Sequence, residues 1–273
     1  MKLGISMNLS RTVPEEWARR HKELGLSAVV FPRAHTAPIG EIDACVAAAK
    51  EFGLHIAEVG SWKNLLSPDK ATREENFAHC LHQLELAEYV GADCCVNISG
   101  ARGEQWDGAY PENYAPETYE TIITDIRELL DRVKPQKTAY TLEPMPWMHP
   151  DSPEDYLQMI RDVDRPGFAV HMDMVNMVCT PERYLFSADF TRRAFALLGP
   201  YVKSCHLKDV ALSPKLTFQL AEVPCGEGGF DIAAYIREAE QVNPDMPMII
   251  EHLRSEEAYL KAIAYIKQLT EKE

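Results

Sequence analysis

The feature that most constrains the fold is an alternation of two kinds of segment along the whole chain. Short apolar runs alternate with longer segments whose apolar residues recur at helical spacing, and no linker interrupts the series. Runs that are apolar throughout are typical of parallel strands with both faces of the sheet covered. They predict strands at Lys2–Met7, Ser27–Pro32, His55–Val59, Asp93–Ile98, Ala139–Glu143, Gly167–Met172, Val202–Leu207 and Pro247–Glu251.

The segments between these runs carry helix signals. Ser152 and Thr180 each precede a proline at the first helical position, where its missing N–H does no harm. Eight β-then-α units predict a (β/α)8 TIM barrel of class α/β, as one domain over residues 1–273. The alternative is an open doubly wound sheet, but no GxGxxG motif follows an early strand, so its dinucleotide-binding form lacks support. Helices are predicted at Pro14–Leu24, Glu41–Glu51, Arg73–Tyr89, Pro116–Val133, Ile232–Gln241 and Glu256–Leu269, and after Ser152 and Thr180.

Composition narrows the possible partners. The formal net charge of −14 argues against nucleic acid, whose phosphates attract Lys and Arg. The seven cysteines are scattered without a CxxC pair, and the vicinal Cys94 and Cys95 lie in an apolar run, as expected of reduced core residues. The first ten residues lack a signal-peptide core, and no run is long enough to cross a membrane. We therefore expect a cytoplasmic protein without a nucleic-acid or membrane partner.

Four of the later apolar runs end in a residue that can bind a metal. Active sites of such barrels form at the carboxyl ends of the strands, and neighbouring strands lie about 4.8 Å apart, so four adjacent ends can converge. Three carboxylates at one point repel one another unless a cation joins them. Oxygen donors with one imidazole favour Mn²⁺ or Mg²⁺, and Co²⁺ or Zn²⁺ is also compatible. The candidate metal ligands are Glu143, Asp173, His206 and Glu251.

The motifs around these residues resemble those of the xylose isomerase-like TIM barrels, the sugar phosphate isomerase/epimerase superfamily. The motifs are LEPMP at 142–146, HMDMVN at 171–176, CHLKD at 205–209, GEGGFD at 226–231 and IIEH at 249–252. The resemblance implies the same four metal ligands. Its ketose 3-epimerase branch further implies that Glu143 and Glu251 act as catalytic acid and base. It also suggests a homo-oligomer, a dimer or a tetramer.

This resemblance predicts a metal-dependent sugar isomerase or epimerase. Such an enzyme removes a C–H proton beside a carbonyl, and a metal ion stabilises the enediolate while a carboxylate accepts the proton. The substrate, a sugar or sugar phosphate, stays open. Asn176 stands where the ketose 3-epimerases are expected to carry histidine, and the expected arginine after the metal histidine is missing. The alternatives are a metal-dependent lyase of the keto-inositol dehydratase type and a non-catalytic carbohydrate-binding barrel.

Further residues are candidates for substrate binding. Lys208 lies two residues past His206, so on a continuing strand its side chain points to the same side. Asn176 can bond a sugar hydroxyl, and Trp62, after the third strand, can serve as a platform for a sugar ring; Trp147 follows the fifth strand in the same way.

His171 calls for a different interpretation, because it precedes Asp173 by two residues and so lies deeper in the barrel. It is expected to support the site from below rather than to bind the ion.

Overall fold

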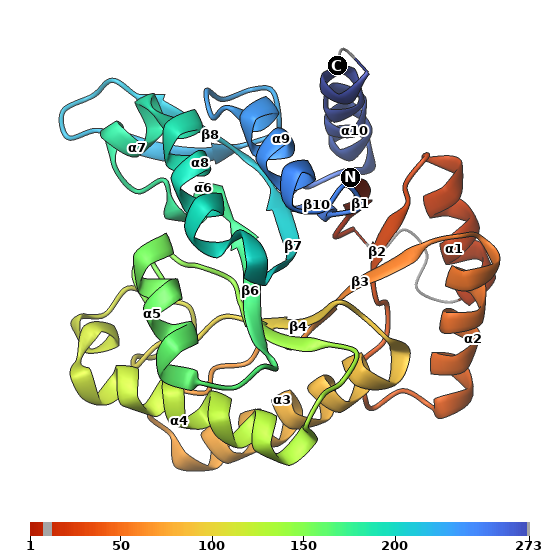
Figure 1. The fold of residues 1–273 in the computed structure, drawn as a ribbon, viewed down its shortest axis with the longest axis vertical. Coiled ribbons are helices and arrows are strands. Elements are labelled where there is room, and N and C mark those ends of the chain that lie inside the picture. The colour runs from red at the N-terminus through yellow and green to blue at the C-terminus, as the bar shows by residue number, and fades with distance from the viewer. Residues whose placement is uncertain (8–12, 272–273) are drawn as a thin grey trace.

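The computed structural model describes residues 1–7 and 13–271. Residues 8–12 and 272–273 lie outside it. The prediction that the first ten residues lack a signal-peptide core therefore falls partly outside the described residues. Eight parallel strands form a nearly closed barrel in the order β1-β10-β7-β6-β5-β4-β3-β2. The predicted TIM barrel is therefore confirmed (Figure 1). The strands are β1 (Lys2–Ile5), β2 (Ala28–Val30), β3 (His55–Gly60), β4 (Cys94–Asn97), β5 (Ala139–Leu142), β6 (Phe168–Asp173), β7 (Val202–Leu207) and β10 (Pro247–Ile250).

The barrel closes between its first two strands. The backbone N–H of Ser27, just before β2, donates to the carbonyl of Leu3 in β1 at 2.9 Å. Gly4 allows this close approach. A Cβ at this position would lie 2.5 Å from the side chain of Ile249 and 2.7 Å from the carbonyl oxygen of Ala28. Glycine is therefore required where β1 is squeezed between its two neighbours.

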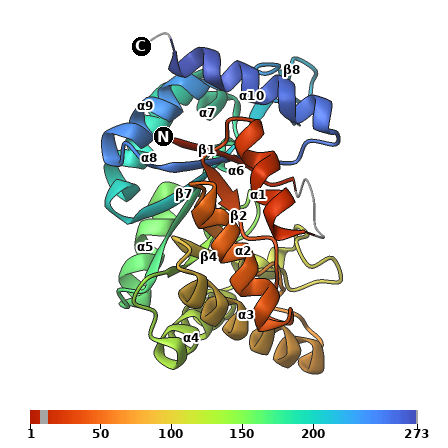
Figure 2. The ribbon, with the colours of Figure 1, turned by 90° about the vertical axis from the view of Figure 1, so that its right-hand side faces the viewer.

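The helices surround the strands on the outside, and Figure 2 shows α1 and α2 covering the side of β1 and β2. Ser152 caps α5 by accepting from the Asp155 N–H, and Thr180 caps α7 by accepting from the Arg183 N–H, as their sequence signals indicate. The helices are α1 (Pro14–Glu23), α2 (Ile39–Glu51), α3 (Lys70–Val90), α4 (Pro116–Val133), α5 (Pro153–Val163), α6 (Met174–Met177), α7 (Pro181–Leu185), α8 (Ser187–Leu198), α9 (Ile232–Val242) and α10 (Glu256–Thr270).

The structure differs most from the sequence prediction at the start of α3 and in the segments after β6 and β7. Helix α3 begins at Lys70 rather than Arg73, because the Asp69 side chain accepts the Thr72 N–H and caps an earlier start. The segment after β6 contains three helices, α6 to α8, instead of one. The segment after β7, for which the sequence indicates no strand, contains an antiparallel hairpin, β8 (Asp209–Ser213) and β9 (Gln219–Val223).

Two further sequence features can be compared with the fold. Cys94 and Cys95 are fully buried in β4 and carry free thiols, as the apolar run around them predicts. Within the described part of the chain, no helix combines the length and the apolar character needed to cross a bilayer.

Candidate metal centre

Four neighbouring strands bring the predicted metal ligands together. Strands β5, β6, β7 and β10 are consecutive in the sheet. Glu143 follows β5, Asp173 ends β6, His206 lies near the end of β7, and Glu251 follows β10. One potential ligand atom from each residue lies within 4.8 Å of the others. We call Glu143, Asp173, His206 and Glu251 the donor quartet.

The donor quartet is buried around one imidazole nitrogen. His206 Nδ1 lies 3.0 Å from Glu251 Oε2, 3.2 Å from Glu143 Oε1 and 3.9 Å from Asp173 Oδ2. No member exposes more than 6% of its surface. Three carboxylates are thus held close together where water screens their charges poorly.

Lys208 places a positive charge among these carboxylates. Its Nζ lies 2.6 Å from Asp173 Oδ2, 2.8 Å from Glu251 Oε1 and 3.6 Å from Glu143 Oε1. The side chain is buried and points to the side predicted from strand alternation. Lys208 also donates to Asn176 Oδ1 at 3.0 Å, and Asn176 Nδ2 donates to Glu143 Oε1 at 3.0 Å. The Lys208 ammonium therefore offsets part of the negative charge of the quartet.

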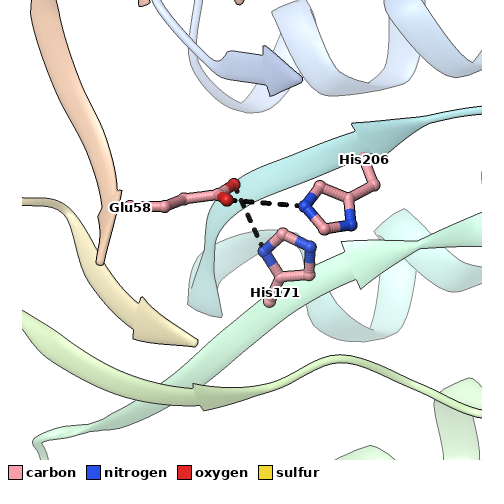
Figure 3. A group of neighbouring side chains, drawn as sticks. All are labelled: Glu58, His171 and His206. Atoms are coloured by element: carbon pink, nitrogen blue, oxygen red, sulfur yellow. Dashed lines mark hydrogen bonds and ion pairs between the residues drawn. The ribbon is translucent and has the colours of Figure 1, made fainter. Parts of the chain in front are cut away.

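Glu58 is a buried carboxylate that sequence reasoning missed. It lies on β3, with Oε2 3.4 Å from His206 Nε2 and Oε1 3.5 Å from His171 Nδ1, as Figure 3 shows. His171 Nδ1 is also 2.7 Å from Ser204 Oγ. We call Glu58, His171 and His206 the Glu58 triad; its members are at most 2% exposed. His171 thus lies below the quartet, where the sequence placed it.

The two groups share His206 but use different ring nitrogens. Nδ1 faces the carboxylates of the quartet, whereas Nε2 faces Glu58. A sequence signal for Glu58 existed, because it stands between Ala57 and Val59 in an otherwise apolar strand. A glutamate that is fully buried at such a position needs a partner.

A cavity of about 780 Å³ opens above the quartet at the carboxyl ends of the strands. Glu143 and Glu251 contribute to its lining, as do three of the side chains considered for substrate binding, Trp62, Trp147 and Asn176. Lys208 is buried against the carboxylates and is not among the described residues that line the cavity. The candidate metal centre therefore forms part of an accessible pocket.

Comparison with known proteins supports this picture. A model of the family described as "Xylose isomerase-like TIM barrel" matches residues 18–269. The chain belongs to this family. No curated protein matches this xylose isomerase-like barrel in sequence.

Solved structures share the fold of this xylose isomerase-like barrel at low sequence identity. A D-psicose 3-epimerase from Clostridium cellulolyticum H10, solved with D-tagatose, is 14% identical with a TM-score of 0.74, over 99% of both chains. A probable 3-DHS dehydratase from Bacillus anthracis is 16% identical with a TM-score of 0.75, over 99% of both chains. A family member from Mycobacterium smegmatis in complex with magnesium is 20% identical with a TM-score of 0.69, covering 96% of this chain and 89% of that one.

The two glutamates of the quartet differ in protonation. Burial and the negative charge of Glu251 raise the pKa of Glu143 to about 7. Burial also acts to raise the pKa of Glu251, but the positive charges of His206 and Lys208 outweigh it and hold that pKa well below its usual range. Near neutral pH this xylose isomerase-like barrel thus carries one protonatable and one ionised carboxyl group side by side.

The donor atoms fit a hard divalent cation. Three carboxylates and one imidazole offer the oxygen-rich set that Mn²⁺ and Mg²⁺ prefer. Among the described residues, Asp173 Oδ2 and Glu251 Oε1 have no hydrogen-bond partner of good geometry, although the Lys208 ammonium is close to both. Buried carboxylate oxygens of this kind are stabilised by an ion. In this xylose isomerase-like barrel, the quartet would hold that ion.

Proposed function

We propose that this protein is a divalent-metal-dependent sugar isomerase or epimerase. The observation that carries the proposal is the convergence of Glu143, Asp173, His206 and Glu251 beneath an open pocket. Mn²⁺ or Mg²⁺ is the proposed ion, with Co²⁺ or Zn²⁺ also compatible with the donor set. The magnesium complex of a family member and the sugar epimerase of the same fold support this assignment.

The two glutamates divide the proton transfer between them. When bound, a divalent cation supplies positive charge beside the substrate carbonyl and makes the adjacent C–H bond more acidic. Glu251, which its neighbours keep ionised, accepts the proton from that carbon. Glu143, which follows β5 on the same rim, takes up a proton from solvent and returns it to a carbon or to an oxygen. A carbon-bound proton therefore exchanges with solvent during turnover.

Three further side chains are proposed to position the substrate. Trp62 and Asn176 line the pocket, where an indole face suits a sugar ring and an amide suits a hydroxyl group. Lys208 lies within the cluster of carboxylates and would donate to a substrate oxygen. A homo-oligomeric state and a cytoplasmic location remain predictions from the sequence.

A dehydratase reaction is the second candidate. It begins with the same proton abstraction but then expels a hydroxyl group one carbon further along. The presence of a second carboxyl group, Glu143, beside Glu251 at the same rim favours it, because this group can protonate a departing hydroxyl. A probable dehydratase shares the fold over nearly the whole chain.

Deuterium exchange tests the proposal. Ketoses, aldoses and their phosphates are incubated in D₂O, with Mg²⁺ for NMR and with Mn²⁺ for mass spectrometry. We expect deuterium at a carbon beside the carbonyl, and its loss in Glu143→Gln and Glu251→Gln. Glu257→Gln, which changes an exposed glutamate on α10, is the matched control and keeps full exchange.

Mass separates the alternatives. Isomers and epimers keep the mass of the substrate apart from deuterium, whereas a lyase product has lost one water. A metal-loaded protein that binds sugars but exchanges no carbon-bound proton over the whole panel is a carbohydrate-binding barrel, and this outcome overturns the proposed function.

A further inference from the structure

The pocket is larger than a single sugar ring on its floor requires. Its volume of about 780 Å³ lies in the upper part of the range of roughly 300–1,000 Å³ that accommodates drug-sized ligands. A sugar whose reacting carbon lies near Glu143 and Glu251 fills only the part next to the strand ends. The remaining volume is available for a second group on the ligand.

Three of the four tryptophans of the chain surround this remaining volume. Trp62, Trp106 and Trp147 follow β3, β4 and β5, and each leaves 38–40% of its surface exposed. The fourth, Trp17, is buried in the core. Indole rings left open to water inside a pocket are apolar surface that a ligand can cover. Their grouping at one mouth of the barrel indicates a binding site for a flat apolar group.

Two of these tryptophans, Trp147 and Trp62, are held in position before any ligand arrives. The Trp147 indole N–H donates to the backbone carbonyl of Asp107 at 2.7 Å, which joins the loops after β4 and β5. Trp62 has a φ of 39°, in the left-handed region that bulky residues rarely adopt. Its indole lies against Gly60, where a Cβ would come within 2.2 Å of the ring nitrogen. Such preorganisation lowers the entropic cost of binding.

More apolar surface comes from the hairpin after β7 and from the segment after β6. Phe218 and Leu220 of the hairpin line the pocket, as do Val175 and Val178. Phe218 is 47% exposed although it is a large apolar side chain. Elements far apart in the sequence thus add apolar side chains to one volume.

The charges at this pocket disfavour an anionic ligand. Asp107 and Glu222 line it in addition to the two glutamates of the quartet, and they are not members of the metal-binding set. The His252 imidazole lies 3.1 Å from Glu222 and 3.6 Å from Glu251, so its positive charge would already be compensated. A phosphate group brought beside these carboxylates would be repelled by them.

From these observations we infer that the substrate is an uncharged glycoside whose aglycone is a flat apolar ring held among Trp62, Trp106 and Trp147. The inference rests on the proposed function for the sugar end of the ligand. In a glycoside the anomeric carbon is blocked, so the carbonyl that the proposed chemistry needs lies at another ring carbon. An oxidation of a ring hydroxyl group must therefore supply this substrate.

Tryptophan fluorescence gives a direct test, because three of the four indoles line the pocket. The probes are phenyl β-D-glucopyranoside, D-glucose and D-glucose 6-phosphate, titrated into the metal-loaded protein, with calorimetry as a second readout. Phenyl glucoside is expected to bind at least tenfold more tightly than glucose, and glucose 6-phosphate more weakly than glucose. Equal affinity for glucose and phenyl glucoside, or tighter binding of the phosphate, overturns the inference.

Variants locate the aglycone site. Trp106→Ala should remove most of the preference for phenyl glucoside over glucose, and Trp106→Phe should restore part of it. Tyr201→Ala, which truncates an exposed aromatic residue at the opposite end of the barrel just before β7, should keep the full preference. A Trp106→Ala protein that melts like the parent and keeps the preference also contradicts the inference.

Failure of the binding test can be distinguished from failure of the exchange test. Phenyl glucoside binding is measured without turnover. Tight binding combined with no deuterium exchange in any keto-sugar, phenyl glycosides with a ring ketone included, would therefore retain the aglycone site and refute the enzymatic function. Deuterium exchange in a simple ketose, combined with no preference for phenyl glucoside over glucose, would retain the enzymatic function and refute the aglycone site.

Discussion

The donor quartet and the Glu58 triad are both buried and both contain His206, yet their charges balance differently. In the quartet, three carboxylates surround one imidazole nitrogen and the Lys208 ammonium, beneath an open pocket. In the triad, one carboxylate lies between two imidazoles inside the barrel. Burial opposes the ionised form of Glu58, but His206 and His171 outweigh it and keep its pKa below the usual value.

The charges of the quartet require an ion, whereas the Glu58 triad positions one ligand of that ion. An excess of negative charge in a site open to solvent is satisfied by a cation that enters from solution. A carboxylate facing the far nitrogen of a metal-binding histidine instead fixes the ring orientation and its tautomer. Glu58 faces His206 Nε2 and so leaves Nδ1 directed at the quartet.

The largest effect expected from this comparison is that of Asp173→Asn. The substitution removes one charged oxygen donor and keeps the size of the side chain. Mn²⁺ affinity should therefore fall by more than roughly 100-fold, which exceeds the loss typical of residues that contact a metal ligand but not the metal itself. Calorimetric titration of the metal-free protein measures the affinity, and the rise in melting temperature on adding Mn²⁺ should disappear with it. Unchanged affinity would mean that the quartet is not the metal site.

Glu58→Gln should have a smaller effect of the same sign. The amide fills the same space, but it can donate to His206 Nε2 and so no longer enforces the tautomer that leaves Nδ1 free. Mn²⁺ affinity should drop by roughly 10–100-fold. Asp125→Asn is the matched control, because Asp125 is also a buried carboxylate but pairs with Arg73 away from the site. It should lower stability and leave metal affinity as it was; equal losses in both variants would refute a positioning role.

The smallest expected effect is the pH dependence of metal binding. The pKa of Glu143 is raised to about 7, so below this pH its proton competes with the ion for the same oxygens. Mn²⁺ affinity should therefore rise with pH through this range. Burial lowers the pKa of His206, but Glu251, Glu143 and Glu58 outweigh it and raise that pKa well above its usual value. Because the imidazole must lose its proton before Nδ1 can bind an ion, the rise should continue above pH 7, and titrations in buffers of different ionisation enthalpy should detect more than one released proton at pH 6. Glu143→Gln should remove the Glu143 part of this dependence, whereas Glu58→Gln should keep that part, since Glu58 is already ionised.

The quartet could be predicted from the sequence because the barrel is regular. Once eight parallel strands are assigned, the residues that end consecutive strands must share one rim, so Glu143 and Glu251 can be placed together although they lie far apart in the chain. The alternation of side chains along β7 likewise gave the side on which Lys208 lies. Local periodicity and topology together were enough for these features.

The partners of Glu58 and the presence of the hairpin could not be predicted, for physical reasons. Glu58 contacts His171 and His206 across the inside of the barrel, and no spacing along the sequence records which side chains meet there. Strand β9 is largely exposed and carries polar residues, and β8 has an apolar run of only three residues, so neither shows the longer apolar run that marks the barrel strands.

The attachment of the hairpin has a consequence for how such a barrel can diversify. The Asp209 carboxylate, at the base of the hairpin, accepts hydrogen bonds from the backbone N–H groups of Gly226, Gly228 and Phe230. The turn at 214–218 lies at the far end, and its last residue, Phe218, reaches the pocket. Mutations in the turn can therefore change which substrates bind, while the hydrogen bonds at the base keep the metal centre unchanged. Substrate range and reaction chemistry can thus evolve in separate parts of the hairpin.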